Sequence, residues 1–277
     1  MTSESFESDV ARHERFRFGQ NWTDFLRLVT DAHIEEAKKS LQSMLSLPDL
    51  AGKRFLDLGS GSGLFSLAAF QLGATKVLSL DYDPRSVACA VELRRRYADG
   101  DSHWEALEGS VLDEGLLARL GQWDIVYCWG VLHHTGSMWQ GIDHAASCVA
   151  PNGLFFISIY NDQGRLSAFW RAVKAQYNRG FLGKAAVTSV FVPYFAVRGA
   201  VADLVRLRNP LMRYRNYRSQ RAMSMVHDWY DWLGGYPFEV ARPEEIVEGV
   251  LARSFTLRKL KTCGGSHGCN EFVFQKN

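Results

Sequence analysis

The chain contains few cysteines. Five occur among its 277 residues, and three of them lie within apolar helical or strand patterns. Small secreted domains are commonly held together by an even and dense set of disulfide-forming cysteines. An odd number of scattered cysteines argues against such a scaffold and predicts reduced thiols in a cytoplasmic protein. The five are Cys89, Cys128, Cys148, Cys263 and Cys269.

Signals for export or for crossing a membrane are also sparse. The first nine residues are acidic and polar, unlike the basic and apolar parts of a signal peptide. No uninterrupted apolar run approaches the roughly 20 residues of a membrane span. We therefore expect neither a signal peptide nor a transmembrane helix.

A strong excess of one charge is absent as well, because the formal net charge is +2. No RNA-binding module is visible either, so the sequence argues against nucleic acid as a partner. The exception is residues 163–226, which contain twelve Lys or Arg residues and a single acid, Asp203. This segment is also rich in aromatic residues, and residues 185–197 carry no charge.

What the chain does contain is a glycine-rich segment at residues 55–65, Phe-Leu-Asp-Leu-Gly-Ser-Gly-Ser-Gly-Leu-Phe. Residues 54–58 read as a buried strand, and residues 62–72 read as a helix whose N-terminus faces the turn. A second strand at residues 76–80 brings Asp81 beside that turn. A carboxylate in this position can accept both hydroxyl groups of a ribose. The pattern predicts a site for a nucleoside-bearing cofactor.

The spacing of the glycines separates two cofactor classes. Gly59, Gly61 and Gly63 do not follow G-x-G-x-x-G, because Leu64 holds the last position of that pattern. Asp57 would repel a pyrophosphate but suits a cationic amino-acid group. A nicotinamide or flavin enzyme, or a glycine loop that serves only a turn, remains the alternative.

This arrangement resembles the class I S-adenosylmethionine-dependent methyltransferases, and in particular bacterial small-molecule enzymes of the quinone-biosynthesis type. The resemblance spans about 130 residues. Its further motifs are Asp81-Tyr82, Gly109-Ser110-Val111, Trp123-Asp124-Ile125-Val126 and Ala150-Pro151-Asn152-Gly153. It implies S-adenosyl-L-methionine as the cofactor, with S-adenosyl-L-homocysteine as its product.

The order of elements predicts an α/β, Rossmann-like, seven-stranded and mostly parallel sheet with one antiparallel strand. Only about six residues join the last two strands, which is too few for a crossover, so the seventh strand must be antiparallel. A helical lid is inserted between strands five and six. We expect an N-terminal helical arm at 1–50, the core at 51–160 and 241–277, and a basic, aromatic-rich cap at 161–240. The remaining strands are expected at 103–108, 124–129, 153–160, 255–262 and 270–275.

The cofactor-binding residues that the resemblance implies lie mainly after strands one to four. Ser110 stands where the family commonly has an Asp that binds the adenine amino group. Trp129 reads equally as a wall of the site or as a core residue, and the aromatic segment at 17–22 reads as an arm with or without ligand contact. The candidates are Asp57, Gly59, Ser60, Gly61, Gly63, Asp81, Tyr82, Ser110, Val111, Trp129, Phe18 and Trp22.

Methyl transfer is an in-line displacement in which alignment supplies much of the rate, so a general base is optional. His134, Asp162 and His133 are the catalytic candidates. The histidines read alternatively as hydrogen-bonded scaffolding, and Asp162 reads alternatively as a cap or turn residue.

Substrate-binding candidates come from the ends of strands five and six and from the aromatic segment at 227–239. They are Asn161, His227, Asp231, Tyr236, His267 and Asn270. The aromatic segment reads alternatively as a rigid hinge. The turn at 263–269 contains Cys and His, but its three glycines favour a plain hairpin, so no metal is expected.

The sequence therefore predicts a cytoplasmic enzyme that methylates an oxygen of a small anionic or amphipathic metabolite. N- or C-methylation is the alternative, as is a peripheral membrane or RNA-binding protein that retains the cofactor fold. Weak association with a membrane surface through residues 185–221 is a further expectation. The sequence does not predict the oligomeric state.

Overall fold

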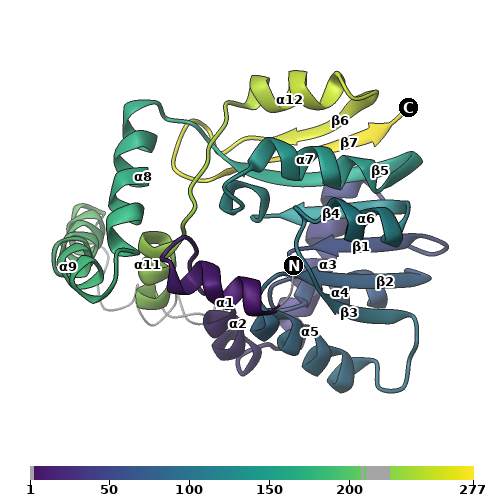
Figure 1. The fold of residues 1–277 in the computed structure, drawn as a ribbon, viewed down its shortest axis with the longest axis horizontal. Coiled ribbons are helices and arrows are strands. Elements are labelled where there is room, and N and C mark those ends of the chain that lie inside the picture. Colours follow the sequence, from purple (N-terminus) through teal and green to yellow (C-terminus); the bar gives the residue numbers. More distant parts are fainter. Residues whose placement is uncertain (1–2, 207–208, 210–224) are drawn as a thin grey trace.

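A computed structural model describes residues 3–206, 209 and 225–277 of the chain. Its centre is a seven-stranded sheet with the strand order β3-β2-β1-β4-β5-β7-β6 (Figure 1). The strands are β1 (Arg54–Leu58), β2 (Lys76–Asp81), β3 (Trp104–Glu108), β4 (Trp123–Trp129), β5 (Val149–Tyr160), β6 (Phe255–Lys261) and β7 (Cys269–Lys276).

Strand β7 is antiparallel to both of its neighbours, whereas β1 to β5 pair in parallel. The predicted mostly parallel sheet is thereby confirmed. Since β6 is antiparallel to β7, it ends at the same edge of the sheet as β1 to β5. We call this the carboxyl edge.

Helices cover both faces of the sheet. Apolar residues of α3 (Asp31–Leu45), α4 (Leu64–Gln71) and α5 (Pro84–Tyr97) pack on one face, and those of α6 (Glu114–Leu120), α7 (Met138–Ser147) and α12 (Pro243–Leu251) pack on the other. Burial on both faces explains why the strands read as nearly continuous apolar runs.

The remaining helices lie toward the carboxyl edge (Figure 1). They are α1 (Ser3–Ala11), α2 (Gly19–Leu26), the short 3-10 helix η1 (Leu132–His134), α8 (Arg165–Tyr177), α9 (Phe181–Val205) and α11 (Met225–Gly234). The last three belong to the insertion between β5 and β6, which fits the predicted lid. Within the expected N-terminal arm, α3 packs on the sheet, while α1 and α2 lie over the edge.

Left-handed residues set the boundaries of two helices, and one of these boundaries differs from the sequence prediction. Helix α4 begins at Leu64 rather than at Ser62, because Gly63 has a left-handed φ of +80° and cannot continue a right-handed helix. Helix α3 ends at Leu45, because Ser46 has a left-handed φ of +56°. Helix α5 begins with Asp83 as the N-cap, followed by Pro84 at the first helical position.

Candidate functional site

The turn between β1 and α4 has a backbone conformation that glycine adopts most easily. Gly59, Gly61 and Gly63 have φ angles of +77°, +55° and +80°. The N–H of Gly59 donates to the Leu80 carbonyl over 2.7 Å, which holds the turn against the end of β2. The Ser60 hydroxyl oxygen is buried in the turn without a hydrogen-bond partner among the described residues, so it is available to a polar group of a ligand.

Gly63 is also required for close packing between the turn and α5. A Cβ at this position would lie 2.8 Å from the Ala90 Cα, and backbone cannot give way cheaply. We expect Gly63→Ala to lower the free energy of unfolding by about 3 kcal/mol, as the sum of left-handed strain and overpacking. Gly52→Ala is the matched control, because Gly52 has a φ of +75° with nothing within 4 Å. It should lose about 1 kcal/mol in urea unfolding, and equal losses in the two variants would contradict the packing argument.

Asp81 lies at the end of β2 and organises the turn with both of its carboxylate oxygens. One oxygen accepts from the Gly61 N–H at 2.8 Å, and the other accepts from the Asp83 N–H at 2.9 Å. Burial raises the pKa of Asp81 to about 7, although these two hydrogen bonds oppose the shift. The carboxyl group is thus placed beside the glycine turn, as the spacing predicted.

Asp57 occupies a different environment under the turn. Its carboxylate accepts from the Ser66 hydroxyl at 2.6 Å, Ser66 accepts from Ser79 at 2.6 Å, and Ser79 accepts from the Trp104 indole at 2.9 Å. Burial raises the pKa of Asp57 to about 7, and the Asp81 carboxylate acts in the same direction. This buried chain of hydrogen bonds fixes one oxygen of Asp57 in place.

The N-terminal helix α2 lies directly on the glycine turn. The Trp22 ring is so close that a Cβ on Gly61 would lie 2.9 Å from it. The N–H of Gly19 donates to the Asp83 carboxylate at 2.9 Å, which fastens the start of α2 to the loop after β2. The aromatic arm therefore covers the candidate cofactor site.

A second set of contacts connects α1 and its following loop to Tyr82. The Tyr82 hydroxyl donates to Asp9 at 3.0 Å, and the Arg15 guanidinium lies 5.0 Å from the centre of the Tyr82 ring. Arg15 also donates to the carbonyl oxygens of His134 and Thr135 at 3.1 Å and 3.4 Å. The Arg15 side chain, which is 19% exposed, thus connects Tyr82 to the segment after β4.

The candidate residues at the ends of β3 and β4 differ in how far they are buried. The Ser110 hydroxyl is buried and accepts from the Leu112 N–H at 3.1 Å, so it caps its own loop. Val111 is buried as well, whereas Trp129 is 43% exposed. This exposure excludes the reading of Trp129 as a core residue.

His134 is held in a defined tautomer next to the arm. Its Nδ1 lies 2.7 Å from the Pro237 carbonyl, which can only accept, so Nδ1 carries the proton and Nε2 keeps its lone pair. Burial lowers the pKa of His134 to about 3, and the charges of Lys174 and Arg15 contribute to the shift. The Phe18 ring lies 5.0 Å from the imidazole, so the arm connects the cofactor turn to this histidine.

His133 is buried beside His134, with the two ring centres 4.6 Å apart. Burial lowers the pKa of His133 well below its ordinary value, and His134 and Lys174 act in the same direction. Its Nδ1 has no hydrogen-bond partner among the described residues. A buried polar atom of this kind requires a partner from a ligand or from water.

An aromatic cluster lies next to the two histidines, at the junction of β5, α8, α11 and the β6–β7 turn. Tyr160 lies 4.0 Å from His133 between ring centres, and Trp232 lies 5.8 Å from Tyr160. Trp232 is in turn 5.6 Å from Trp170 and 5.7 Å from His267. We define the aromatic cluster as Tyr160, Trp170, Trp232, Phe238 and His267.

Lys174 is fully buried against this cluster. Its ammonium group donates to the Trp232 carbonyl and lies 4.0 Å and 4.9 Å from the ring centres of Trp232 and Phe238. The Trp170 indole N–H is buried in the same cluster without a hydrogen-bond partner among the described residues. A cation and two incompletely satisfied polar atoms, those of Trp170 and His133, thus share one aromatic surrounding.

Asn161 and Asn270 connect the end of β5 to the start of β7. The Asn270 amide donates to the Asn161 side-chain oxygen at 3.0 Å, and its own oxygen accepts from the Cys263 N–H at 3.1 Å. Asn270 thus secures the hairpin turn. Among the described residues, no group of three or more His, Cys, Asp or Glu side chains is arranged to hold a metal ion.

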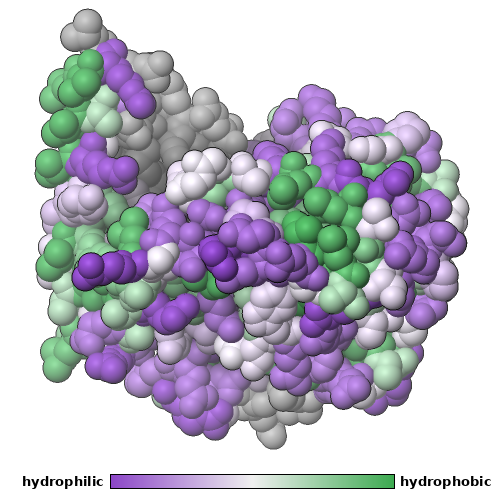
Figure 2. Space-filling view, turned by 90° about the horizontal axis from the view of Figure 1, so that it is seen from above, coloured by the Kyte–Doolittle hydropathy of each residue, from purple (hydrophilic) through white to green (hydrophobic). Residues whose placement is uncertain are grey.

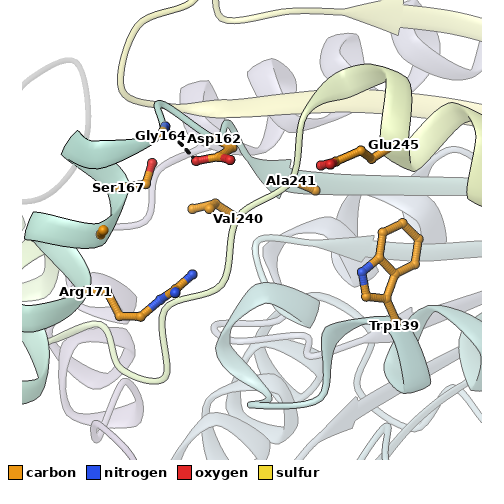
Figure 3. A pocket seen from close by; sticks show the side chains of 9 residues that line it. Trp139, Asp162, Gly164, Ser167, Arg171, Val240, Ala241 and Glu245 are labelled. Atoms are coloured by element: carbon orange, nitrogen blue, oxygen red, sulfur yellow. Dashed lines mark hydrogen bonds between the residues drawn. The ribbon is translucent and has the colours of Figure 1, made fainter.

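Asp162 accepts from the Gly164 N–H at 2.8 Å, which is turn chemistry at the entry to α8. It also lines a cavity of about 470 Å³ between α8, α7 and α12, together with Arg171, Glu245 and Trp139 (Figure 3). Arg171 is oriented there by donating to the Phe238 carbonyl at 3.1 Å. The structure thus groups Asp162 with these charged residues.

The last candidates lie around the aromatic segment that leads back to the sheet. The Tyr236 carbonyl accepts from the Phe16 N–H at 3.0 Å, so this segment is attached to the N-terminal arm. Burial lowers the pKa of His267, which lies in the aromatic cluster. The side chains of His227 and Asp231 in α11 lie outside the described residues.

Lys174 and Arg15 were not identified from the sequence, although Lys174 left a signal. The buried positions of α8 are Ser167, Trp170, Lys174 and Tyr177, which recur at spacings of three, four and three. A lysine on such a stripe indicates a buried charge. Arg15 shows no comparable pattern, because its role depends on how the arm folds back.

A family model described as a methyltransferase domain matches residues 30–228. A ribosomal protein L11 methyltransferase of Vibrio parahaemolyticus is 32% identical over 110 residues, which are 40% of this chain and 34% of that protein. An uncharacterized protein of a Synechococcus strain is 32% identical over 120 residues, which are 43% of this chain and 28% of that protein. The chain thus matches about a third or less of the length of these relatives.

Solved structures show the same fold at low identity. An O-methyltransferase family protein from Burkholderia thailandensis superposes with a TM-score of 0.54 at 15% identity, covering 89% of this chain and 58% of that one. The magnesium protoporphyrin IX methyltransferase of Synechocystis PCC 6803, with bound S-adenosylhomocysteine, gives 0.52 at 13% identity, covering 91% and 86%. Both likenesses concern the arrangement of the elements around the sheet.

Proposed function

Since this chain belongs to the methyltransferase domain family and takes its methyl group from S-adenosylmethionine, we propose that it transfers that group to an oxygen of a small anionic or amphipathic acceptor. The cofactor supplies an electrophilic methyl group on a sulfonium. The site described above fits this cofactor, because two polar groups lie at the glycine turn. They are the Asp81 carboxylate, which can bind the ribose hydroxyls, and the Ser60 hydroxyl, which has no hydrogen-bond partner among the described residues. Trp22 and Tyr82 supply apolar surface beside them.

Charge at this site also suits the methionine part of the cofactor. Arg15 offers a partly buried guanidinium to its carboxylate, and Asp57 offers a carboxylate to its ammonium group. These assignments rest on charge complementarity and burial.

The acceptor is proposed to bind in the aromatic cluster beside His133 and His134. Planar apolar walls favour an aromatic or otherwise apolar body, and Lys174 favours a negative charge on it. The observation that carries this proposal is the fully buried Lys174 surrounded by aromatic rings. A group that accepts hydrogen bonds would also satisfy the Trp170 indole.

His134 is proposed to take the proton that an acceptor hydroxyl loses when it is methylated. The oxygen forms its new bond to the methyl carbon, the carbon–sulfur bond breaks toward sulfur, and the hydroxyl proton passes to Nε2. A neutral hydroxyl becomes far more acidic than an imidazolium as its bond to carbon forms, so a base with a pKa of about 3 suffices.

The proposal is tested with pairs of acceptors of nearly the same shape that differ in charge, such as 4-hydroxybenzoate against 4-hydroxybenzamide. We expect kcat/KM to be about 10- to 100-fold higher for the anionic member, because a hydrogen bond to a charged group contributes about 1.5–3 kcal/mol. Lys174→Met should remove this preference while leaving S-adenosylhomocysteine binding intact. The product is identified by mass spectrometry.

Lys184→Met is the matched control, since Lys184 also lies over an aromatic ring of the cap, 5.6 Å from the centre of Tyr177, but is exposed. This variant should keep the preference. A preference that survives in Lys174→Met, or its absence from the wild type, would count against the proposed acceptor class.

A further inference from the structure

Helix α9 presents an apolar stripe to solvent along its whole length. The stripe consists of seven positions spaced three or four residues apart, which keeps them on one side of a helix. They are Leu182, Ala186, Val190, Pro193, Val197, Val201 and Leu204. The side chains of Leu182, Val190, Val197, Val201 and Leu204 are 80%, 61%, 63%, 52% and 61% exposed.

Ordinary explanations for an apolar helix do not apply to α9. By length and composition alone it is apolar enough to cross a membrane, and its most apolar 18-residue stretch has a mean hydropathy of 1.5, although Lys184, Arg198 and Asp203 interrupt the apolar run. A core helix would be mostly buried, whereas only 6% of its most apolar stretch is buried inside the molecule. A signal sequence would lie near the N-terminus, whereas α9 spans residues 181–205.

The opposite side of α9 is already engaged with the cap. Phe191 and Phe195 lie 5.3 Å and 6.2 Å from Trp170 between ring centres, and Val187 is buried in the same apolar group. Helix α9 is therefore fixed along the outer side of the molecule (Figure 1). Figure 2 shows apolar residues gathered along the left edge, the end of the molecule at which α9 lies.

The exposed charges of α9 are all positive, and they lie off the apolar stripe, since Lys184 faces the Tyr177 ring of the cap. The cations Lys184 and Arg198 lie within α9, and Arg206 is its C-cap. The single acid of α9, Asp203, is buried. Further along the sequence are Arg208, Arg213, Arg215, Arg218 and Arg221, of which the structure describes none.

We propose that α9 docks lengthwise on the surface of an anionic lipid bilayer. A helix with an exposed apolar face, whose exposed charges on its other sides are all cations, can lie in the interface of an anionic bilayer. Fixing of the inner side of α9 by Phe191 and Phe195 makes it a helix that lies on the membrane rather than one that spans it. Docking places Trp170, which contacts both α9 and the aromatic cluster, on the membrane side of the acceptor site.

Sedimentation with vesicles tests this proposal in the full chain. We expect the wild type to bind vesicles of equimolar phosphatidylcholine and phosphatidylglycerol more strongly than vesicles of phosphatidylcholine alone. Val190→Glu combined with Val197→Glu should lower the partition coefficient at least ~10-fold, because two carboxylates would enter the interface. Leu182→Glu combined with Val201→Glu should do the same independently.

Val91→Glu combined with Leu251→Glu is the matched control, because both side chains are 42% exposed but lie on α5 and α12. Its partition coefficient should stay within about twofold of the wild type. Calorimetric binding of S-adenosylhomocysteine to each variant shows whether its cofactor-binding core is folded. Failure of that binding in the wild type would count against the proposed function, and the vesicle result would still decide the docking.

Three outcomes would overturn the proposal. The wild type could fail to bind either kind of vesicle, or the glutamate variants could bind as it does. Light scattering could instead show a dimer that Val190→Glu with Val197→Glu converts to monomers without any vesicle binding. In that last case a second copy of the chain, rather than a membrane, covers the stripe.

Discussion

Replacing Asp81 with asparagine is expected to raise the Kd for S-adenosylhomocysteine by about 100-fold. A carboxylate can accept both ribose hydroxyls while it holds the N–H groups of Gly61 and Asp83. The amide keeps the shape but loses one acceptor and the negative charge, and each hydrogen bond to a charged group contributes about 1.5–3 kcal/mol. Titration calorimetry measures the change directly.

Asp124→Asn is the control for this substitution. Asp124 accepts from the Arg54 N–H at 2.8 Å at the start of β1, so it lies at the opposite edge of the sheet. Its Kd should remain close to that of the wild type. Equal affinity of Asp81→Asn and the wild type would remove Asp81 from the cofactor site.

The raised pKa of Asp81 gives this prediction a pH dependence. The group ionises at about 7 in the free folded protein, and ribose binding favours the ionised form. Affinity should therefore fall as the pH is lowered from 8 to 6, and binding should release protons. The pKa of Asp57 is also raised to about 7, so Asp57 adds to the dependence of log Kd on pH. Asp81→Asn should therefore weaken this pH dependence rather than abolish it.

The same shift has the opposite effect on the stability of the free protein. Between the ordinary pKa of 3.8 and the folded value of about 7, the folded state holds more protons than the unfolded state. Stability from this group is therefore highest below pH 4 and is lost as the pH rises through 7.

Replacing His134 with alanine is expected to lower kcat for methyl transfer by about 100-fold. General-base catalysis contributes roughly 10²–10⁴-fold, and the low pKa of His134 places it toward the lower end. The Kd for S-adenosylhomocysteine should change little, because Nε2 faces the acceptor in the proposed reaction. Single-turnover kinetics with the best acceptor of the charge-paired panel measure the chemical step.

His134→Gln separates proton transfer from positioning, because its amide can still donate to the Pro237 carbonyl. If His134 acts as the base, the glutamine variant should be as slow as the alanine variant. Recovery of the rate in His134→Gln would assign the residue a scaffolding role instead. His103→Gln is a control at an exposed histidine and should leave the rate of methyl transfer unchanged.

The strands and the carboxyl edge could be predicted because strong local patterns specify them. The segment Arg54–Leu58 is mostly apolar and is followed by a glycine-rich turn, and β1 has these same bounds. The short connection between β6 and β7 excludes a crossover, and the antiparallel pairing followed from it. The start of α4 was wrong by two residues, because the left-handed φ of Gly63 depends on the packing of the turn.

The site was harder to predict where its residues come from distant segments. Lys174 meets Trp232 across 58 positions of sequence, and Arg15 meets His134 across 119. No periodicity reports such a contact, because it depends on how the cap and the arm fold over the edge. The proposed roles of both residues therefore required the structure.

The segment at Tyr236–Pro237 connects the arm over the cofactor turn to His134, the proposed base. The carbonyl of Tyr236 accepts from Phe16 of the arm that covers the cofactor turn, and the next carbonyl, that of Pro237, fixes the tautomer of His134. If the N-terminal arm opens so that S-adenosylhomocysteine can leave and S-adenosylmethionine can enter, it displaces the segment whose carbonyl orients His134. Turnover would then follow a compulsory order, in which the nucleoside enters first and the acceptor meets a fully assembled base only after the arm has closed.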